Sequence, residues 1–204
     1  MTRVGVLVEC GRAGLEVVVC RKICQLIAAD HGLALAPEIV PMDNKARLIE
    51  ECGTAARTLL ASGCERVVIL WDERPAWPEM HAELCWHHER IRILEQLQNA
   101  RVPEGRAHLV CIEREFESWL LFDHRMLSAV LSTPAHRVHV SKQANPDRRP
   151  NPKGAMITLF NKLAGKRYVD VQFAARFAEC LDGLNRLRKC RTFRRFEERI
   201  TGIN

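Results

Sequence analysis

Acidic residues end three apolar segments of this sequence. Glu9 ends VGVLVE, Asp72 and Glu73 end VVILWDE, and Glu113 ends HLVCIE. One carboxylate in such a place most often caps the next helix, but three such segments in one chain favour a shared role. Converging carboxylates repel one another, and a hard divalent cation such as Mg²⁺ or Mn²⁺ relieves that repulsion. The pattern predicts a metal site able to support phosphodiester hydrolysis.

Alternating strand and helix patterns must position these acids. Runs of β-branched and apolar residues predict strands at 4–9, 34–40, 66–71 and 108–113. Helices are predicted at 13–31, 43–61, 80–100 and 115–131, the second of them capped by Asp43. Such repeats predict an α/β fold with a mostly parallel sheet of about four strands and helices on both faces. Ligands of such sheets bind beyond the carboxyl ends of the strands, where the acids lie.

The pattern changes after residue 131. Residues 132–153 carry prolines among polar and basic residues, which is typical of a loop. Short helices are predicted beyond it, near 155–164, 171–180, 182–189 and 193–200. We therefore predict one domain over residues 1–204, with a βα core at 1–131, the basic loop at 132–153 and a helical part at 154–204.

The helix predicted at 115–131 cannot aim all its acids at one site. Glu115, Trp119 and Asp123 are one turn apart and share a face, whereas Glu117 follows Glu113 by one turn. We therefore favour Glu113 and Glu117 as metal ligands and a structural role for Asp123. A core position is the better interpretation of Trp119 than a base-stacking one.

The amino-acid composition limits the classes of protein to which this chain can belong. The chain has 204 residues, of which 47% are hydrophobic, and a formal net charge of +6, which is typical of a folded domain. No apolar run reaches the roughly 20 residues of a membrane helix, and no signal peptide precedes the first strand, so we expect a cytoplasmic protein. The nine cysteines are scattered in apolar segments and are expected to be free thiols packed as small hydrophobes.

Several other kinds of site are disfavoured. Cys85, His87 and His88 are soft ligands, but their spacing spreads them around a helix, and no second Cys/His pair at zinc spacing lies nearby. The sequence contains no Gly-rich phosphate loop, dinucleotide fingerprint or nucleophile elbow. Kinase, dehydrogenase and esterase functions are therefore disfavoured.

Basic residues gather near the carboxyl terminus. Arg188, Arg191 and Arg195 would lie near one stripe of a continuous helix, with Arg194 beside them, although Thr192 is predicted to be an N-cap that breaks the helix. A solvated basic face and a surface for the phosphate backbone of nucleic acid are both open.

The sequence resembles the Toprim fold, in which a glutamate follows the first strand and an Asp-x-Asp follows a later one; Glu9 and Asp72 match. More closely it resembles the Toprim-like family known as domain of unknown function 4276, over most of the chain. The matching segments are Glu9, VVILWD, the run from Glu113 to Asp123, Asn151-Pro152-Lys153, Tyr168 and residues 187–193.

The resemblance implies roles for these residues. By analogy with the Toprim nucleases of the overcoming-lysogenization-defect group, Glu9 and Asp72 would bind metal, Glu113 and Glu117 would form a second acidic pair, and Lys153 would stabilise charge at the scissile phosphate. The sequence departs from the pattern at Asp72-Glu73-Arg74, where an arginine replaces the second aspartate. Either Glu73 substitutes as a ligand or Arg74 contacts phosphate itself.

Three functions follow. The leading hypothesis is an Mg²⁺- or Mn²⁺-dependent nuclease, which analogy with related families places in prokaryotic defence. The second is a catalytically impaired module that binds nucleic acid or a partner ATPase, because of Arg74. The third is a binding protein unrelated to nucleic acid, whose acids only cap helices.

Overall fold

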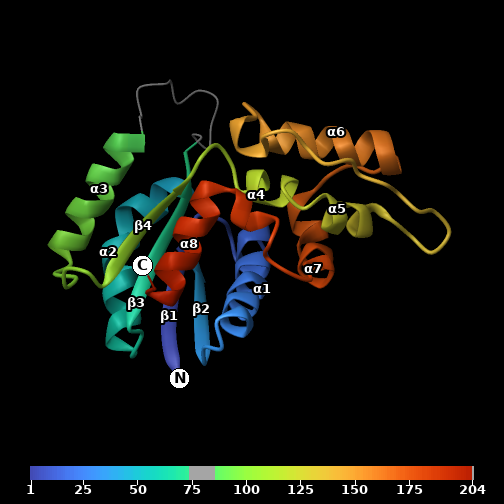
Figure 1. Cartoon of the computed structure of the whole chain (residues 1–204). Helices are drawn as coiled ribbons and strands as arrows, with labels where there is room; N and C mark the ends of the chain where they lie inside the picture. Colours follow the sequence, from blue (N-terminus) through green and yellow to red (C-terminus); the bar gives the residue numbers. More distant parts are fainter. Residues whose placement is uncertain (74–85, 204) are drawn as a thin grey trace.

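A four-stranded, all-parallel sheet forms the centre of the computed structural model, which describes residues 1–73 and 86–203. The strand order is β2-β1-β3-β4. This confirms the predicted α/β fold, which is Rossmann-like, and its parallel sheet (Figure 1). The strands are β1 (Thr2–Val8), β2 (Leu35–Pro41), β3 (Arg66–Asp72) and β4 (Ala107–Ile112).

Helices cover both faces of the sheet (Figure 1). One face carries α2 and α3, and the other carries α1 and the helices that follow β4. Gly53 of α2 lets the backbone of α3 approach, because a Cβ there would lie 2.1 Å from the carbonyl oxygen of Gln96. The helices are α1 (Leu15–Asp30), α2 (Lys45–Ala61), α3 (Trp86–Asn99), α4 (Glu117–Leu121), α5 (His124–Leu131), α6 (Pro152–Ala164), α7 (Asp170–Cys180) and α8 (Arg191–Thr201).

Alternation along the strands explains why both faces are apolar. In β3, Val67 and Ile69 pack against α2 and α3, whereas Val68 and Leu70 face the larger core on the other side. Successive side chains of a strand point to opposite faces, so a run of apolar residues without alternation requires cover on both sides. The continuous VVILW run therefore belongs to a central strand.

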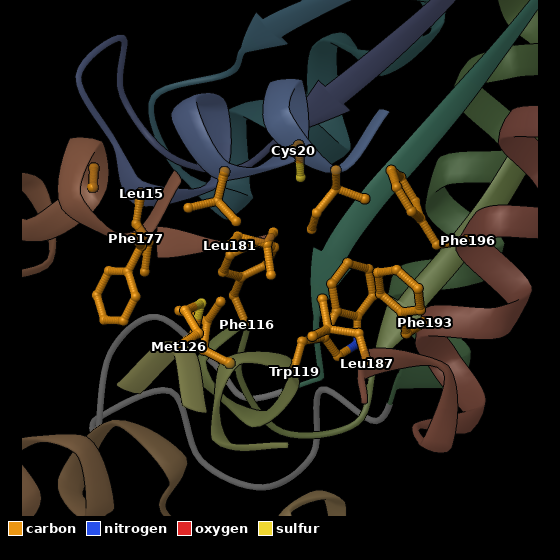
Figure 2. Packing of buried hydrophobic residues seen from close by; sticks show 14 of the residues in the cluster. Leu15, Cys20, Phe116, Trp119, Met126, Phe177, Leu181, Leu187, Phe193 and Phe196 are labelled. Atoms are coloured by element: carbon orange, nitrogen blue, oxygen red, sulfur yellow. The ribbon is translucent and has the colours of Figure 1, made fainter. Parts of the chain in front are cut away.

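The larger core joins the sheet to the helices of the carboxyl-terminal part. Trp119 of α4 is completely buried. Its ring centroid lies 5.2 Å from that of Phe193 and 5.4 Å from that of Phe196, both in α8 (Figure 2). The indole Nε1 of Trp119 donates a hydrogen bond to Oγ1 of Thr192 at 2.9 Å. The predicted core role of Trp119 is confirmed, and the contact fixes α8 beside the sheet.

Several predicted boundaries need correction. The helix predicted at 115–131 is two helices, because Asp123 caps α5 by accepting hydrogen bonds from the N–H groups of Arg125 and Met126. Asn44, not Asp43, caps α2. Thr192 is not an N-cap; it lies in the first turn of α8. The helix predicted at 182–189 is only a 3₁₀ turn at residues 187–189, and a second 3₁₀ turn occupies residues 146–148 of the predicted loop.

Asp123 has the structural role that its helix position indicated. It is completely buried, and its carboxylate also lies 3.4 Å from the guanidinium of Arg186. All eight cysteines of the described chain are free thiols, as expected, and Cys85 lies outside the described residues. No helix in residues 1–73 or 86–203 is long and apolar enough to cross a membrane.

Candidate active site

Glu9 and Asp72 lie at the point where the strand order reverses. The chain goes from β1 to β2 on one side and then returns to β3 on the other side of β1. Val8 pairs with Leu70, so Glu9 and Asp72 leave the carboxyl ends of two adjacent strands. In open α/β sheets, ligands bind at this switch point. The fold therefore places the two best-matched acids in the expected ligand position.

Glu9 is held in an unfavourable environment for a carboxylate. Its Oε2 atom is buried and has no hydrogen-bond partner among the described residues. Burial raises the pKa of Glu9 to about 8; Lys45 lowers it, whereas Glu16 and Glu89 raise it. A buried carboxylate without enough partners favours protonation or a bound cation.

Asp72 shares this environment. Burial raises its pKa well above the usual value, and repulsion from Glu9, Glu16 and Glu117 raises it further, while Lys45 acts in the opposite direction. Glu16 lies in the first turn of α1, where a negative charge also interacts favourably with the helix dipole. Glu16 is absent from the predicted set of site residues, although an acid at the start of the helix that follows β1 was a usable signal.

Glu117 adds a third buried acid with its own partners. The residue is 5% exposed. The hydroxyl of Tyr168 donates to Glu117 Oε1 at 3.2 Å, and Nζ of Lys153 lies 3.9 Å from the same oxygen. Burial raises the pKa of Glu117 to about 7, although Lys153 lowers it. Nζ of Lys153 also donates to Asp170 at 2.9 Å, so this lysine joins α6 to the acidic site and to α7.

Lys45 is a cation that the sequence analysis missed. It is 5% exposed, and its Nζ donates to the carbonyl oxygen of Asp72 and, at 3.2 Å, to Oε1 of Glu89. Glu89 also accepts a hydrogen bond of 3.1 Å from Nε1 of Trp71. A lysine directly after the Asn44 cap is ordinarily solvated, and only the packing of α2 and α3 on β3 encloses it.

Glu73 and Glu113 face a different place. Both line a cavity of about 440 Å³ together with Arg114, Arg191 and other residues. Oε1 of Glu113 accepts a hydrogen bond of 3.2 Å from Arg191, and Glu73 lies 4.0 Å from the guanidinium of Arg114. The expected ligand pair of Glu113 and Glu117 is therefore not formed, because Glu117, in the first turn of α4, is buried beside Tyr168, whereas Glu113 follows the end of β4 and contacts Arg191.

The strand ends of Glu9, Asp72 and Glu113 are adjacent, as predicted, but their carboxylates do not form one three-ligand site. Within residues 1–73 and 86–203, no three His, Cys, Asp or Glu side chains are arranged to hold one ion. The described residues instead offer Glu9 and Asp72, with Glu117 nearby. Mg²⁺ in proteins is commonly held by one or two carboxylates, with water and substrate phosphate completing its coordination. The oxygen donors and the unpartnered Glu9 oxygen fit that kind of site.

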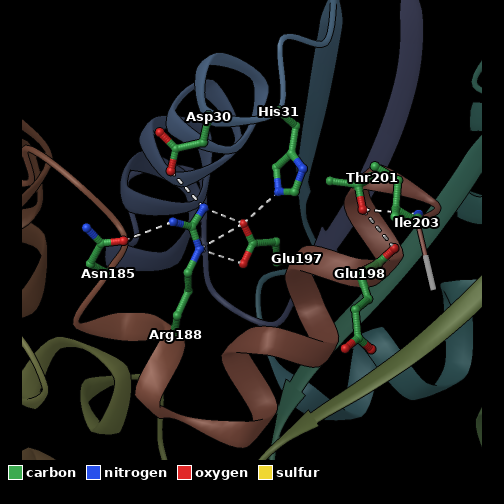
Figure 3. A network of polar contacts seen from close by, with 8 residues as sticks. All are labelled: Asp30, His31, Asn185, Arg188, Glu197, Glu198, Thr201 and Ile203. Atoms are coloured by element: carbon green, nitrogen blue, oxygen red, sulfur yellow. Dashed lines mark hydrogen bonds and ion pairs between the residues drawn. The ribbon is translucent and has the colours of Figure 1, made fainter.

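Arg188 has an internal role rather than a place on a phosphate-binding surface. Its guanidinium donates to both oxygens of Glu197, to Asp30 at 2.7 Å and to Asn185 at 3.2 Å (Figure 3). His31 also contacts Glu197, at 3.1 Å. The network ties α1 to the carboxyl-terminal segment. Arg188 is thus removed from the predicted nucleic-acid surface, because its donors already have carboxylate partners.

Replacing Arg188 with alanine should lower the free energy of unfolding by about 2 kcal/mol, since it leaves Glu197 without its main partner. Burial raises the pKa of Glu197, but the hydrogen bonds from Arg188 and His31 outweigh this, and the net shift is downward. This contribution is present above the unfolded pKa of glutamate and is lost as pH falls through the folded pKa. Urea unfolding at pH 7 and pH 3.5 should show a smaller difference between wild type and R188A at the lower pH.

The matched control for R188A is Arg92→Ala, which removes an exposed pair with Glu50. Exposed pairs of this kind contribute less than about 1 kcal/mol. Equal losses in the two variants would contradict a structural network at Arg188.

The other predicted basic residues differ in surroundings. Arg191 and Arg195 line the cavity of Glu73 and Glu113, whereas Arg194 is exposed on another side of α8. Lys153 lies at the acidic site, where its Nζ is 3.9 Å from Glu117 Oε1. Arg74, on which the choice between one and two metal ions depended, lies outside the described residues.

Comparison with known proteins adds no relative to this picture: no family model, no curated protein and no solved structure matches the chain.

Proposed function

We propose that this protein is a divalent-metal-dependent phosphodiester hydrolase that acts on nucleic acid. The observation that supports the proposal most is the arrangement of Glu9 and Asp72. Both leave adjacent strands at the switch point of the sheet, both have raised pKa values because of burial, and Oε2 of Glu9 is buried without a partner in the described chain. A ligand that brings positive charge would relieve this arrangement.

Oxygen donors of this kind select a hard cation, Mg²⁺ or Mn²⁺. When bound, such an ion would lower the pKa of a water molecule and neutralise charge on the phosphoryl oxygens. Glu9 and Asp72 would hold it. Neither Glu73 nor Glu113 is part of this proposed set, because both contact arginines at the separate cavity.

The two lysines at the site, Lys153 and Lys45, have different roles. Lys153 is half-exposed, and burial lowers its pKa while Glu117 and Asp170 outweigh that effect, so the net shift is upward and the amine stays charged. A charged amine beside the acids can stabilise the negative charge that develops on a phosphate under attack. Lys45 is buried under Asp72 and holds its strand end in place through the carbonyl oxygen.

A second candidate function is a catalytically impaired module that binds nucleic acid or a partner ATPase. Two observations favour it. No three ligand side chains in the described part of the chain are arranged to hold one ion, and Lys45 and Lys153 already offset part of the acidic charge. The two candidates predict the same binding but different chemistry.

The experiment that separates them is incubation of the purified protein with single-stranded and duplex DNA and RNA in Mg²⁺, Mn²⁺ or EDTA. The proposal expects cleavage in metal and none in EDTA. Binding without cleavage under every metal condition would support the impaired module instead.

Glu9→Gln tests the site without relying on turnover. In EDTA, the wild-type protein should lose stability as pH rises from about 5 to about 8, because the folded state keeps protons on Glu9 that the unfolded chain releases. E9Q should be more stable than wild type at pH 8 by on the order of 1–3 kcal/mol, with little difference at pH 5. Added Mg²⁺ or Mn²⁺ should raise the melting temperature of wild type more than that of E9Q.

The control for E9Q is Glu95→Gln, at an exposed position of α3. E95Q should follow wild type at both pH values and in metal. If E9Q were less stable than wild type at pH 8, the inferred cost of a buried charge on Glu9 would be wrong.

A further inference from the structure

Three arginines of α8 form a row along one side of the helix. Arg191, Arg195 and Arg199 are spaced four residues apart, so each is turned by about 40° from the one before. The row is about 12 Å long at a rise of about 1.5 Å per residue. The opposite side of α8 carries the buried Phe193 and Phe196. The buried side fixes the helix, and the arginine row is left facing outward.

One end of the row opens on the cavity at the carboxyl edge of the sheet. This cavity of about 440 Å³ lies at the ends of β3 and β4. Four arginines line it: Arg114, Arg148, Arg191 and Arg195. Arg114 has a φ of +75°, which side-chain-bearing residues rarely adopt. Glu73, Glu113 and Asp147 also line the cavity, and the pairs with Arg114 and Arg191 are exposed ones that a phosphate could replace at small cost.

The other end of the row opens on a second cavity at the amino edge of the sheet. This cavity has a volume of about 470 Å³ and lies at the starts of β3 and β4. Arg66, Arg106, His108 and Arg199 contribute to its lining, with Glu65 and Glu198 as the acids. Burial lowers the pKa of His108, and the charges of Arg199 and Arg66, which line the same cavity, lower it further.

The two cavities are connected by α8, which packs on β4 and β3 (Figure 1). Arg191 and Arg195 belong to the first cavity and Arg199 to the second. The α8 groove, defined by these three arginines and the two cavities, therefore carries positive charge from one edge of the sheet to the other. A single phosphate or small anion would need only one cavity, whereas a chain of phosphates matches a row.

We propose that the α8 groove binds the phosphodiester backbone of a nucleic acid strand and leads it to the carboxyl edge where Glu9 and Asp72 lie. Each strand of a duplex carries one phosphate per about 3.4 Å of helix axis. A row of arginines about 12 Å long therefore spans roughly three or four phosphates of one strand. Arginine suits this task because its planar fork can donate two hydrogen bonds to one phosphate. The inference rests on the proposed function for its ligand, but it concerns binding and not cleavage.

One exposed arginine of the same helix, Arg194, lies outside the groove. Arg194 is turned by about 100° from Arg195 and lines neither of the two cavities. Both residues are exposed and neighbouring in sequence. Arg194 is therefore a matched control for the groove, since removing it changes the net charge equally.

The test is fluorescence anisotropy in EDTA with labelled single-stranded DNA and RNA of about 20 nucleotides, longer than a typical binding site. The double variant R195A/R199A should bind about tenfold more weakly than wild type at about 0.15 M salt. Its slope of log affinity against log salt should be smaller by about 1.4, which corresponds to two lost phosphate contacts at about 0.7 each. The control R194A/R90A, which removes two exposed arginines outside the groove, should lose less than about twofold.

The DNA and RNA arms show which nucleic acid the groove prefers. Equal losses in the two double variants, or a wild type that binds neither strand, would overturn the groove. Failure of the proposed function has a different signature: groove-dependent binding would persist, but no metal ion would produce cleavage. Conversely, metal-dependent cleavage by R195A/R199A with wild-type affinity would reject the groove and leave the hydrolase proposal standing.

Discussion

Trp119→Ala is expected to lower the free energy of unfolding by about 3–5 kcal/mol and the melting temperature by roughly 10 °C. The residue has no exposed surface and its ring lies among Phe116, Phe193 and Phe196 (Figure 2). Alanine would leave a cavity between α4 and α8 and would remove the hydrogen bond that Trp119 donates to Thr192. Urea unfolding followed by far-ultraviolet circular dichroism measures the loss.

The size of this effect can be separated into packing and hydrogen bonding. Thr192→Val keeps the shape but leaves the indole N–H of Trp119 without its acceptor, which should cost on the order of 1–3 kcal/mol. Ile91→Ala, at a half-exposed position of α3, is the control and should change stability by less than about 1 kcal/mol. A loss below about 1 kcal/mol in W119A would mean that α8 does not depend on this tryptophan.

Asp72→Asn is expected to reduce metal-dependent cleavage by at least about 100-fold, because the variant loses a ligand charge that contributes several kcal/mol to the stabilisation of the transition state. The amide has nearly the same shape as the carboxylate, so the strand end and the contact of Lys45 with the main-chain carbonyl can persist. Removing one of several mutually repelling buried acids should also leave the metal-free protein no less stable than wild type.

Rates of cleavage in Mg²⁺ and Mn²⁺ with the nucleic acid that wild type cleaves best provide the measurement. Asp182→Asn, at an exposed position after α7, is the matched control and should retain the wild-type rate. Cleavage by D72N at the wild-type rate, or wild-type cleavage that survives EDTA, would remove Asp72 and its metal from the mechanism. A loss of rate together with loss of folding would show up as a lower melting temperature.

Local patterns were sufficient for most elements of this protein. The continuous apolar run of β3 and the strand–helix alternation predict a parallel sheet, because strands buried on both faces need apolar residues at every position. The same reasoning placed Glu9 and Asp72 at strand ends, since a polar residue that ends such a run leaves the core. Trp119 was also interpreted correctly as a core residue and Asp123 as a structural one, although the break between α4 and α5 means that no single helix carries both.

Contacts between distant segments decided the rest. Glu117 is buried beside Tyr168, 51 residues away, and Arg188 meets Asp30, 158 residues away; no local pattern contains such pairings. The strand order brings β1 beside β3 and so joins Glu9 to Asp72, while the turn after β4 sends Glu113 to Arg191. A sequence determines which residues carry charge and which segments are apolar, but the direction of a charged side chain depends on the partners that packing brings within a few ångströms of it. For this reason the acids were identifiable from the chain, whereas their division between a buried acidic cluster and an arginine-lined cavity required the fold.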